Sequence, residues 1–152
     1  MPEFRYKARV GNVPSYQISS IPFASGNITL PPGEQVQVKF PNVTRFVTVV
    51  NNTSGSEESF LRVGFSSRGV DGAENASSER PQAAVPSGGQ NNYYFVLKNG
   101  ESYTADWRLT SIYLMADALV SGRTLTGSVI AGCTGIDYRE LSTNWSGTVG
   151  VG

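Results

Sequence analysis

The chain has 152 residues, no histidine, one cysteine, and twelve basic residues balanced by twelve acidic ones. Its length suits a single domain with a buried core, because a chain of about 150 residues removes roughly 70% of its unfolded surface from water on folding. The zero net charge removes the electrostatic argument for nucleic acid as the main partner. The charged fraction of 16% lies below the usual value of about 25%, and a weakly charged surface favours association with other proteins.

The composition also excludes several kinds of chemistry. Without histidine the chain has no Ser–His–Asp or Cys–His catalytic group and no zinc site that contains histidine. The lone Cys133 excludes an internal disulfide, and its apolar neighbours predict a small buried side chain rather than a reactive thiol. The N-terminal residues carry no apolar signal segment, and no apolar stretch approaches the roughly 20 residues of a membrane helix. We therefore expect synthesis in a reducing cytoplasm, no membrane span and no cofactor.

Alternation of apolar and polar residues with a period of two dominates the chain, and no window has a convincing helical period. Phe4–Val10 is predicted to be a first strand or part of an extended N-terminal arm over residues 1–14. Further strands are predicted in the first half of the chain at Tyr16–Phe23, Asn27–Leu30, Gln35–Phe40, Arg45–Val50 and Ser59–Phe65.

Residues 66–92 are rich in Gly, Ser, Pro and Asn and show no sustained period, which predicts a long loop that joins one sheet to the other. The next strand is predicted at Tyr93–Lys98. Its aromatic residues alternate between the two sides of the strand, so that one set faces the core and the other faces outward. The dipeptide Asn99-Gly100 then predicts a hairpin with a type I′ turn, because that turn needs φ > 0 at both central residues.

The second half of the chain continues with strands predicted at Glu101–Leu109, Ser111–Met115 and Thr124–Ala131. On the first of these, Trp107 shares a face with Tyr103, Ala105 and Leu109, which predicts a core position. The Ser/Thr/Gly-rich end, residues 141–152, is expected to be a flexible tail that becomes ordered against a partner.

Eight or nine short strands, with turn residues about every 8–12 positions, predict one all-β domain built as an antiparallel β-sandwich. An eight-stranded single jelly roll fits this number of strands and this length best. An immunoglobulin-type sandwich is the alternative, and the missing Cys…Trp…Cys pattern weakens it.

The candidate catalytic residues are carboxylates. A glycosidase needs two carboxyl groups held roughly 5–10 Å apart in a cleft. The strand-borne candidates are Glu101, Asp106 and Asp117, and a hydrolase would bring two of them into a deep polar cleft. The other carboxylates are scattered over turns and the long loop, where solvated charges are the usual case. We therefore expect no enzymatic activity.

The candidate contact residues lie in the N-terminal arm, on one strand and in the tail. The basic stripe of the arm is either a solvated edge that resists aggregation or a surface that reaches an acidic neighbouring subunit. Exposed tyrosine and tryptophan are typical of protein interfaces, and saccharide-binding modules use exposed aromatic residues as well. The predicted interface residues are Phe4, Arg5, Tyr6, Lys7, Arg9, Tyr94 and Trp145.

Several strand segments carry a family resemblance when they are taken in order. They are Gln35–Phe40, Arg45–Asn51, Phe60–Ser66, Tyr94–Leu97, Leu109–Leu114 and Ser128–Ile136. This pattern, over roughly residues 27–136, resembles the small single-jelly-roll capsid-associated proteins of large double-stranded DNA viruses, such as penton, minor capsid or decoration proteins. The resemblance implies a virion structural protein in the capsid, which assembles with itself as a trimer or pentamer and with other capsid proteins. The alternative is a carbohydrate- or receptor-binding β-sandwich module, with a glycan as partner.

Overall fold

The structure, a computed structural model, describes residues 8–11, 13–17, 19–71, 93–117 and 123–141. Strands account for most of these residues. The strands are β1 (Ile21–Leu30), β2 (Gln35–Lys39), β3 (Asn42–Asn51), β4 (Phe60–Gly64), β5 (Tyr94–Lys98), β6 (Ser102–Ala105), β7 (Ser111–Ala116) and β8 (Leu125–Asp137). The short helical elements are α1 (Pro14–Gln17), α2 (Ser67–Asp71) and the 3₁₀ turn η1 (Tyr138–Glu140).

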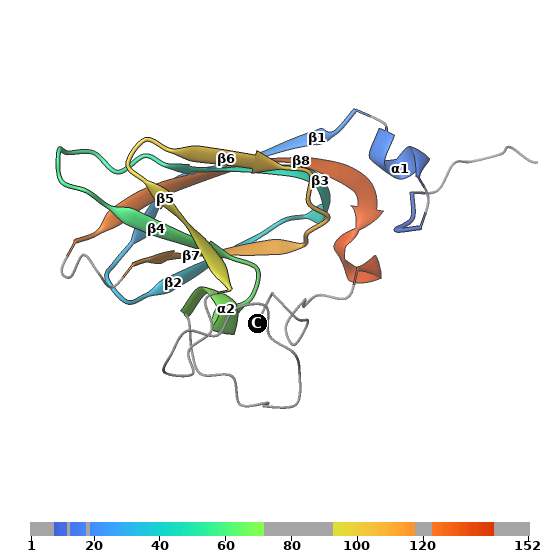
Figure 1. Cartoon of the computed structure of the whole chain (residues 1–152). Helices are drawn as coiled ribbons and strands as arrows, with labels where there is room; N and C mark the ends of the chain where they lie inside the picture. The colour runs from blue at the N-terminus through green and yellow to red at the C-terminus, as the bar shows by residue number, and fades with distance from the viewer. Residues whose placement is uncertain (1–7, 12, 18, 72–92, 118–122, 142–152) are drawn as a thin grey trace, which may run out of the picture.

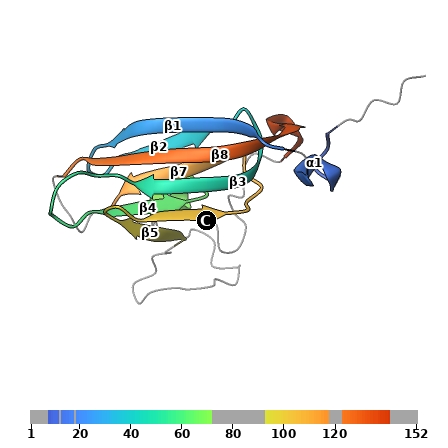
Figure 2. The ribbon, with the colours of Figure 1, turned by 90° about the horizontal axis from the view of Figure 1, so that it is seen from above.

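The strands form two four-stranded sheets that face each other, one in the order β1-β8-β3-β6 and the other in the order β2-β7-β4-β5 (Figures 1 and 2). All of the strand pairs are antiparallel. The first and last strands are neighbours, and consecutive strands change sheet except between β4 and β5. This is the strand order of an eight-stranded jelly roll. The predicted fold is therefore confirmed, and the immunoglobulin-type alternative is wrong.

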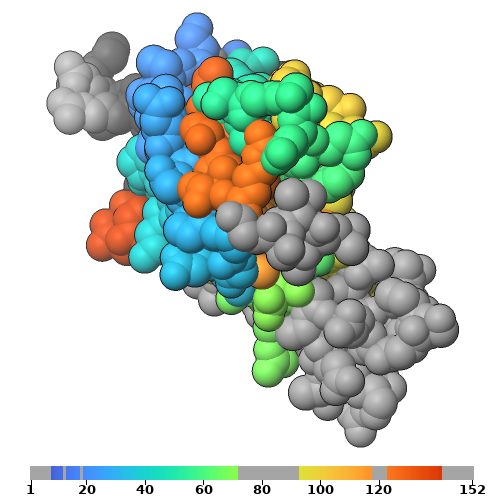
Figure 3. Space-filling model, turned by 90° about the vertical axis from the view of Figure 1, so that its left-hand side faces the viewer, coloured from blue at the N-terminus to red at the C-terminus, as the bar shows by residue number. Residues whose placement is uncertain are grey.

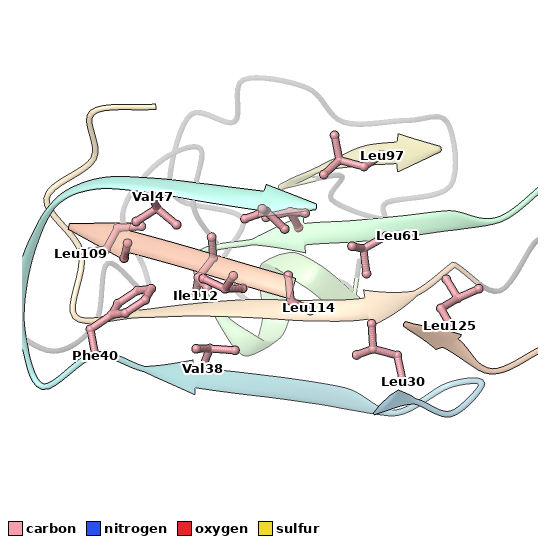
Figure 4. Close-up of a cluster of buried hydrophobic side chains, with 14 of the residues drawn as sticks. Leu30, Val38, Phe40, Val47, Leu61, Leu97, Leu109, Ile112, Leu114 and Leu125 are labelled. Carbon is pink, nitrogen blue, oxygen red and sulfur yellow. The ribbon is translucent and has the colours of Figure 1, made fainter. Parts of the chain in front are cut away.

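The core lies between the sheets and follows the alternation of the strands. In β3, Val47 and Val49 are fully buried, while Thr48 between them faces outward. Leucines from both sheets meet in the middle of the sandwich (Figure 4). At Gly127 in β8, a Cβ atom would lie 3.6 Å from side-chain atoms of Leu30, Leu61 and Leu114. These three leucines join the two sheets.

One end of the sandwich is closed by the start of β8. Figure 3 shows these residues, in orange, between the β1–β2 turn in blue and the connection from β3 to β4 in green. The guanidinium group of Arg123 donates to the carbonyl oxygens of Ser54 at 2.8 Å and Glu57 at 2.6 Å. These hydrogen bonds help to satisfy the backbone carbonyls of the β3–β4 connection.

The turn after β5 differs from the predicted hairpin. Gly100 has φ of 76°, but Asn99 does not lie in the left-handed region, so the turn is not type I′. The physical reason is that this turn carries the chain from one sheet to the other, since β5 pairs with β4 and β6 pairs with β3. The side chain of Asn99 crosses to the β3–β4 connection, where it accepts from the Ser59 backbone N–H at 2.7 Å and donates to the Glu57 carbonyl at 2.7 Å.

The strand predicted at Tyr16–Phe23 is wrong in its first half, because α1 occupies that sequence and β1 begins only at Ile21. The Tyr16 hydroxyl donates to the Val10 carbonyl at 2.9 Å, which folds the chain back on itself. The strand predicted at Asn27–Leu30 is the second half of β1. The two halves are joined through a register shift between Ser25 and Ile28, where Asn27 has φ of 54°.

The strand boundaries in the second half of the chain also differ from the predictions. β6 covers four residues of the predicted Glu101–Leu109, while β8 runs six residues beyond the predicted end at Ala131. Trp107 follows β6 and packs, partly buried, against the core. The predicted buried position of Cys133 is confirmed, since its exposed fraction is 1%.

The arm, the long loop and the tail are attached to the domain where the structure describes them. Ala8, Val10 and Tyr16 pack against a small hydrophobic cluster of Val43, Ile136 and Leu141. This cluster contains part of the predicted arm and the first residue of the predicted tail. The predicted loop over residues 66–92 begins with α2, which lies on the outer side of the β2-β7-β4-β5 sheet (Figure 1). The prediction that this loop joins one sheet to the other is wrong, because the strands before and after it, β4 and β5, pair with each other in the same sheet. Residues 72–92 and 142–152 lie outside the described residues.

Within the described ranges, no helix has the length and apolar composition needed to cross a membrane.

The buried thiol gives a probe of folding. Burial raises the pKa of Cys133 above its ordinary value of 9.0. A hydrogen bond with the backbone of Asn42 lowers this pKa, but by a smaller amount. Because the folded-state pKa is raised, the stability linked to this thiol is present below pH 9 and decreases as the pH rises above it. We expect a disulfide reagent such as DTNB to label the native protein at pH 8 more than about 100-fold more slowly than the urea-unfolded chain. Equal rates would contradict this burial.

Candidate functional site

The structure describes two of the seven predicted interface residues. Arg9 is exposed beside α1, and its backbone N–H donates to the Ser15 hydroxyl at 3.1 Å. Tyr94 is half-buried on the outer side of β5, while Tyr93 is buried and Phe95 packs against the core. The structure does not bring Arg9 and Tyr94 together. The residues outside the described ranges are Phe4, Arg5, Tyr6, Lys7 and Trp145.

Tyr94 belongs to a buried polar cluster around Arg62. The guanidinium carbon of Arg62 lies 4.3 Å from the centroid of the Tyr94 ring. Arg62 Nη2 donates to Asp117 Oδ1 at 3.2 Å, and Nε lies 3.2 Å from Oδ2. The side chains of Arg62 and Asp117 are only 13% and 5% exposed. The Tyr94 ring is therefore engaged within the domain by Arg62, and its predicted contact with a partner stays a prediction.

The same arginine holds α2 on the sheet. Arg62 Nη1 donates to the carbonyl oxygen of Asp71 at 3.1 Å and lies 3.4 Å from that of Val70. These carbonyls end a helix of five residues, and a side-chain donor supplies the hydrogen bonds that the helix itself cannot. The close packing of Val70 on Gly64, where a Cβ atom would come within 2.8 Å, adds to this attachment. The sequence did not indicate this cluster, because its members are far apart in the chain.

The three candidate carboxylates lie in separate places. Asp117 is paired with Arg62, and Glu101 accepts from the Lys98 backbone N–H at 2.8 Å. Asp106 lies in a hollow of about 360 Å³ beside Arg45 and Arg108. In the part of the chain that the structure describes, no three His, Cys, Asp or Glu residues gather into a metal-binding group.

An aromatic cluster fills the space between the edge strands β5 and β6. The rings of Tyr103 and Trp107 stack with centroids 5.7 Å apart and an interplanar angle of 27°. Phe95 lies 5.3 Å from Tyr103, and Phe65 meets Trp107 edge-on at 4.9 Å. Tyr103 is still 49% exposed. Tyr103 is therefore held in place by Trp107 and Phe95, while about half of its surface stays exposed.

The outer side of the β1-β8-β3-β6 sheet carries small, neutral side chains. Across its middle, Ala24, Ile130, Thr48 and Thr104 stand side by side in register. The hydroxyls of Thr48 and Thr104 are 2.7 Å apart, and Ile130 in the centre is 48% exposed. The outward residues, which we call the charge-free face, are Pro22, Ala24, Phe46, Thr48, Val50, Ser102, Thr104, Ser128, Ile130 and Gly132.

The charged residues within β1, β3, β6 and β8 are Arg45 and Asp137. Asp137 comes at the end of β8, and Arg45 lies at a register shift in β3. At Gly132 a Cβ atom would come within 2.3 Å of the Phe46 ring, so only glycine lets this ring lie on the sheet. The central part of this face therefore presents a layer of small and apolar side chains without formal charge.

A groove of about 540 Å³ lies on the outer side of the other sheet, beside η1. Its floor comes from β2 and β7, where Gln37 pairs with Tyr113 and Lys39 pairs with Ser111. Tyr138, the first residue of η1, stands at its side and is 45% exposed. We call this hollow the η1 groove; the lining residues that matter below are Gln37, Lys39, Thr110, Ser111, Tyr113 and Tyr138.

One side of the η1 groove could be predicted from the sequence. The alternation of Gln35–Phe40 places Gln37 and Lys39 on one outward side of their strand. The contribution of Tyr138 depends on the long β8, which ends in a cap where Asp137 accepts from the Arg139 backbone N–H at 2.9 Å. The prediction ended this strand at Ala131, and the groove was therefore missed.

The comparisons with known proteins give no match: no family model, curated protein or solved structure is significantly similar to this chain.

Proposed function

We propose that this protein is a structural virion subunit, a minor capsid, penton or decoration protein that assembles with copies of itself and with other capsid proteins. The observation that carries the proposal is the charge-free face on a jelly roll. Jelly rolls occur in viral capsid proteins and in lectin domains alike, so the surface of this chain, rather than its fold, has to support the choice.

The charge-free face has the chemistry of an interface core. The cores of protein interfaces are depleted of charged residues, because burying an unpaired charge costs several kcal/mol. Here Ile130 supplies an apolar centre, and threonine and serine hydroxyls lie around it. Covering such a surface removes no charged group from water, so the contacts of the interface have only a small desolvation cost to offset. Two faces without charge also do not repel each other, which favours a second copy of the chain as partner.

Subunits of this kind assemble with closed symmetry, and we propose a trimer or a pentamer. The arm Phe4–Val10 and the segment with Trp145 supply additional contacts in this proposal. This contact role stays a prediction for both segments. If particles incorporate a variant without residues 1–10 as well as the full chain, the arm has no such role.

A charge placed on the charge-free face tests the proposal. Ile130→Glu puts a carboxylate at the centre of the face, and we expect at least about a tenfold loss of incorporation into particles, since an unpaired buried charge outweighs a typical interface contribution. The measurement is the amount of tagged protein that co-sediments with purified particles.

The matched control for this test is Val96→Glu. Val96 is 37% exposed on β5 of the other sheet, so the change in the side chain is comparable and the charge-free face stays intact. Incorporation of this variant should stay close to that of the unchanged chain. If Ile130→Glu is incorporated as well as Val96→Glu, the charge-free face is not the assembly surface.

A further inference from the structure

The η1 groove is separate from the charge-free face, because it lies on the outer side of the opposite sheet. Its volume of about 540 Å³ falls within the range of about 300–1,000 Å³ that is usual for small-molecule sites. Its lining includes two tyrosine rings, three neutral polar side chains and a single charged side chain. We propose that the η1 groove binds a saccharide that carries a carboxylate, an activity that goes beyond a role in the shell.

The tyrosines supply apolar surface with a polar end. Tyr113 rises from the floor on β7, and Tyr138 stands at the side on η1. A tyrosine ring gives a flat apolar surface, and its hydroxyl forms hydrogen bonds at the rim. A pyranose ring has matching chemistry, with an apolar face of C–H groups and hydroxyls around its edge. The guanidinium carbon of Arg139 lies 5.8 Å from the Tyr138 ring centroid and helps to hold this ring in place.

The polar side chains of the groove have hydrogen-bonding capacity to offer. Within the described residues, the side chains of Gln37, Thr110 and Ser111 form no hydrogen bond, and neither do the two tyrosine hydroxyls. They offer both donors and acceptors, which the alternating hydroxyls of a sugar require. A purely apolar ligand would leave these groups without partners and is therefore a poor fit.

Lys39 gives the preference for an acidic sugar. It is the one charged residue that lines the groove, and among the described residues no carboxylate lies within ion-pair distance of it. Asp137 precedes Tyr138 in the sequence, but its carboxylate is already paired with Arg139, with Oδ2 and Nη2 2.9 Å apart. The carboxylate of a ligand would thus meet a cation without a competing partner. A partly exposed pair of this kind is worth about 1 kcal/mol, or about a fivefold gain in affinity.

The same features disfavour other anions. A phosphate group is usually held by arginine forks, by several cations or by the backbone N–H groups of a helix or a glycine-rich loop. The lining residues of the groove include neither arginine nor glycine. One ammonium group among hydroxyls and aromatic rings matches a single carboxylate on a neutral, hydroxylated frame more closely.

The test is a titration of the full ¹⁵N-labelled chain with 3′-sialyllactose, followed by amide chemical shifts in NMR spectra. Lactose, which lacks the carboxylate, is the matched ligand. We expect saturable shifts at Lys39, Ser111 and Tyr113, with dissociation constants about fivefold lower for the acidic sugar. Lys39→Gln should remove this difference by raising the dissociation constant of 3′-sialyllactose to that of lactose, while Tyr138→Ala should weaken both ligands.

Two controls separate this site from general effects. Lys98→Gln removes an exposed lysine of β5 that does not line the groove, and it should bind both sugars as the unchanged chain does. Ile130→Glu should also bind normally, because it alters only the charge-free face. Shifts that never saturate, or the same preference for the acidic sugar in Lys39→Gln, would overturn the proposal, whatever the outcome of the assembly test.

Discussion

Replacing Asp117 with alanine is expected to lower the free energy of unfolding by about 3 kcal/mol. The change leaves the Arg62 guanidinium, whose side chain is 13% exposed, without its carboxylate partner. An unpaired buried charge is costly, because water cannot replace the lost interaction. The same substitution should loosen α2, since the arginine is positioned by Asp117 while it donates to the last carbonyls of that helix. Urea unfolding followed by circular dichroism measures the change.

The control for this prediction is Asp137→Ala, which also removes the carboxylate of an Asp–Arg pair. Asp137 and Arg139 are 43% and 75% exposed, so water takes over most of the lost interaction. Its effect should be clearly smaller than that of Asp117→Ala. Equal effects would mean that burial of the Arg62–Asp117 pair contributes nothing to stability.

The second large effect is expected in the core. Leu114→Ala should lower the free energy of unfolding by about 2–5 kcal/mol, because it removes apolar contacts and leaves a cavity between the sheets. Leu114 is fully buried and, with Leu61 of its own sheet, faces Gly127 and Leu30 of the opposite sheet. The midpoint of urea unfolding should fall while the slope stays constant.

Gly127→Ala is the matched control at the same place. Its added Cβ atom would lie 3.6 Å from the three leucines, which is an ordinary van der Waals distance. We expect a much smaller change than that caused by the cavity. If Leu114→Ala costs less than about 1 kcal/mol, the leucines do not join the sheets as the structure describes.

The sequence predicted the sandwich because the alternation of its strands is a local property. Val36 and Val38 on one side, with Gln37 and Lys39 on the other, could be assigned from order alone. The type of the turn at Asn99-Gly100 could not be assigned in this way, because a type I′ hairpin and a crossing between sheets can contain the same dipeptide. The crossing depends on Asn99 reaching Ser59 and Glu57, which are about 40 positions away in the chain.

The surfaces were harder to predict than the core. Low overall charge indicated association, but it did not say where a neutral surface would gather. The charge-free face needs the register that sets Ala24, Ile130 and Thr48 side by side. Tyr94 was predicted to contact a partner, since its exposure follows from alternation, whereas its contact with Arg62 depends on the pairing of β4 and β5.

The oligomeric state of the purified full chain tests the assembly proposal most directly. Sedimentation equilibrium over a concentration range up to about 100 µM would detect even weak association, because a dissociation constant of that size corresponds to about 5–6 kcal/mol. The proposal predicts a closed trimer or pentamer, which Ile130→Glu converts to a monomer and Val96→Glu does not. A monomer for the unchanged chain across the whole range, with the same profile for both variants, would contradict self-assembly through the charge-free face.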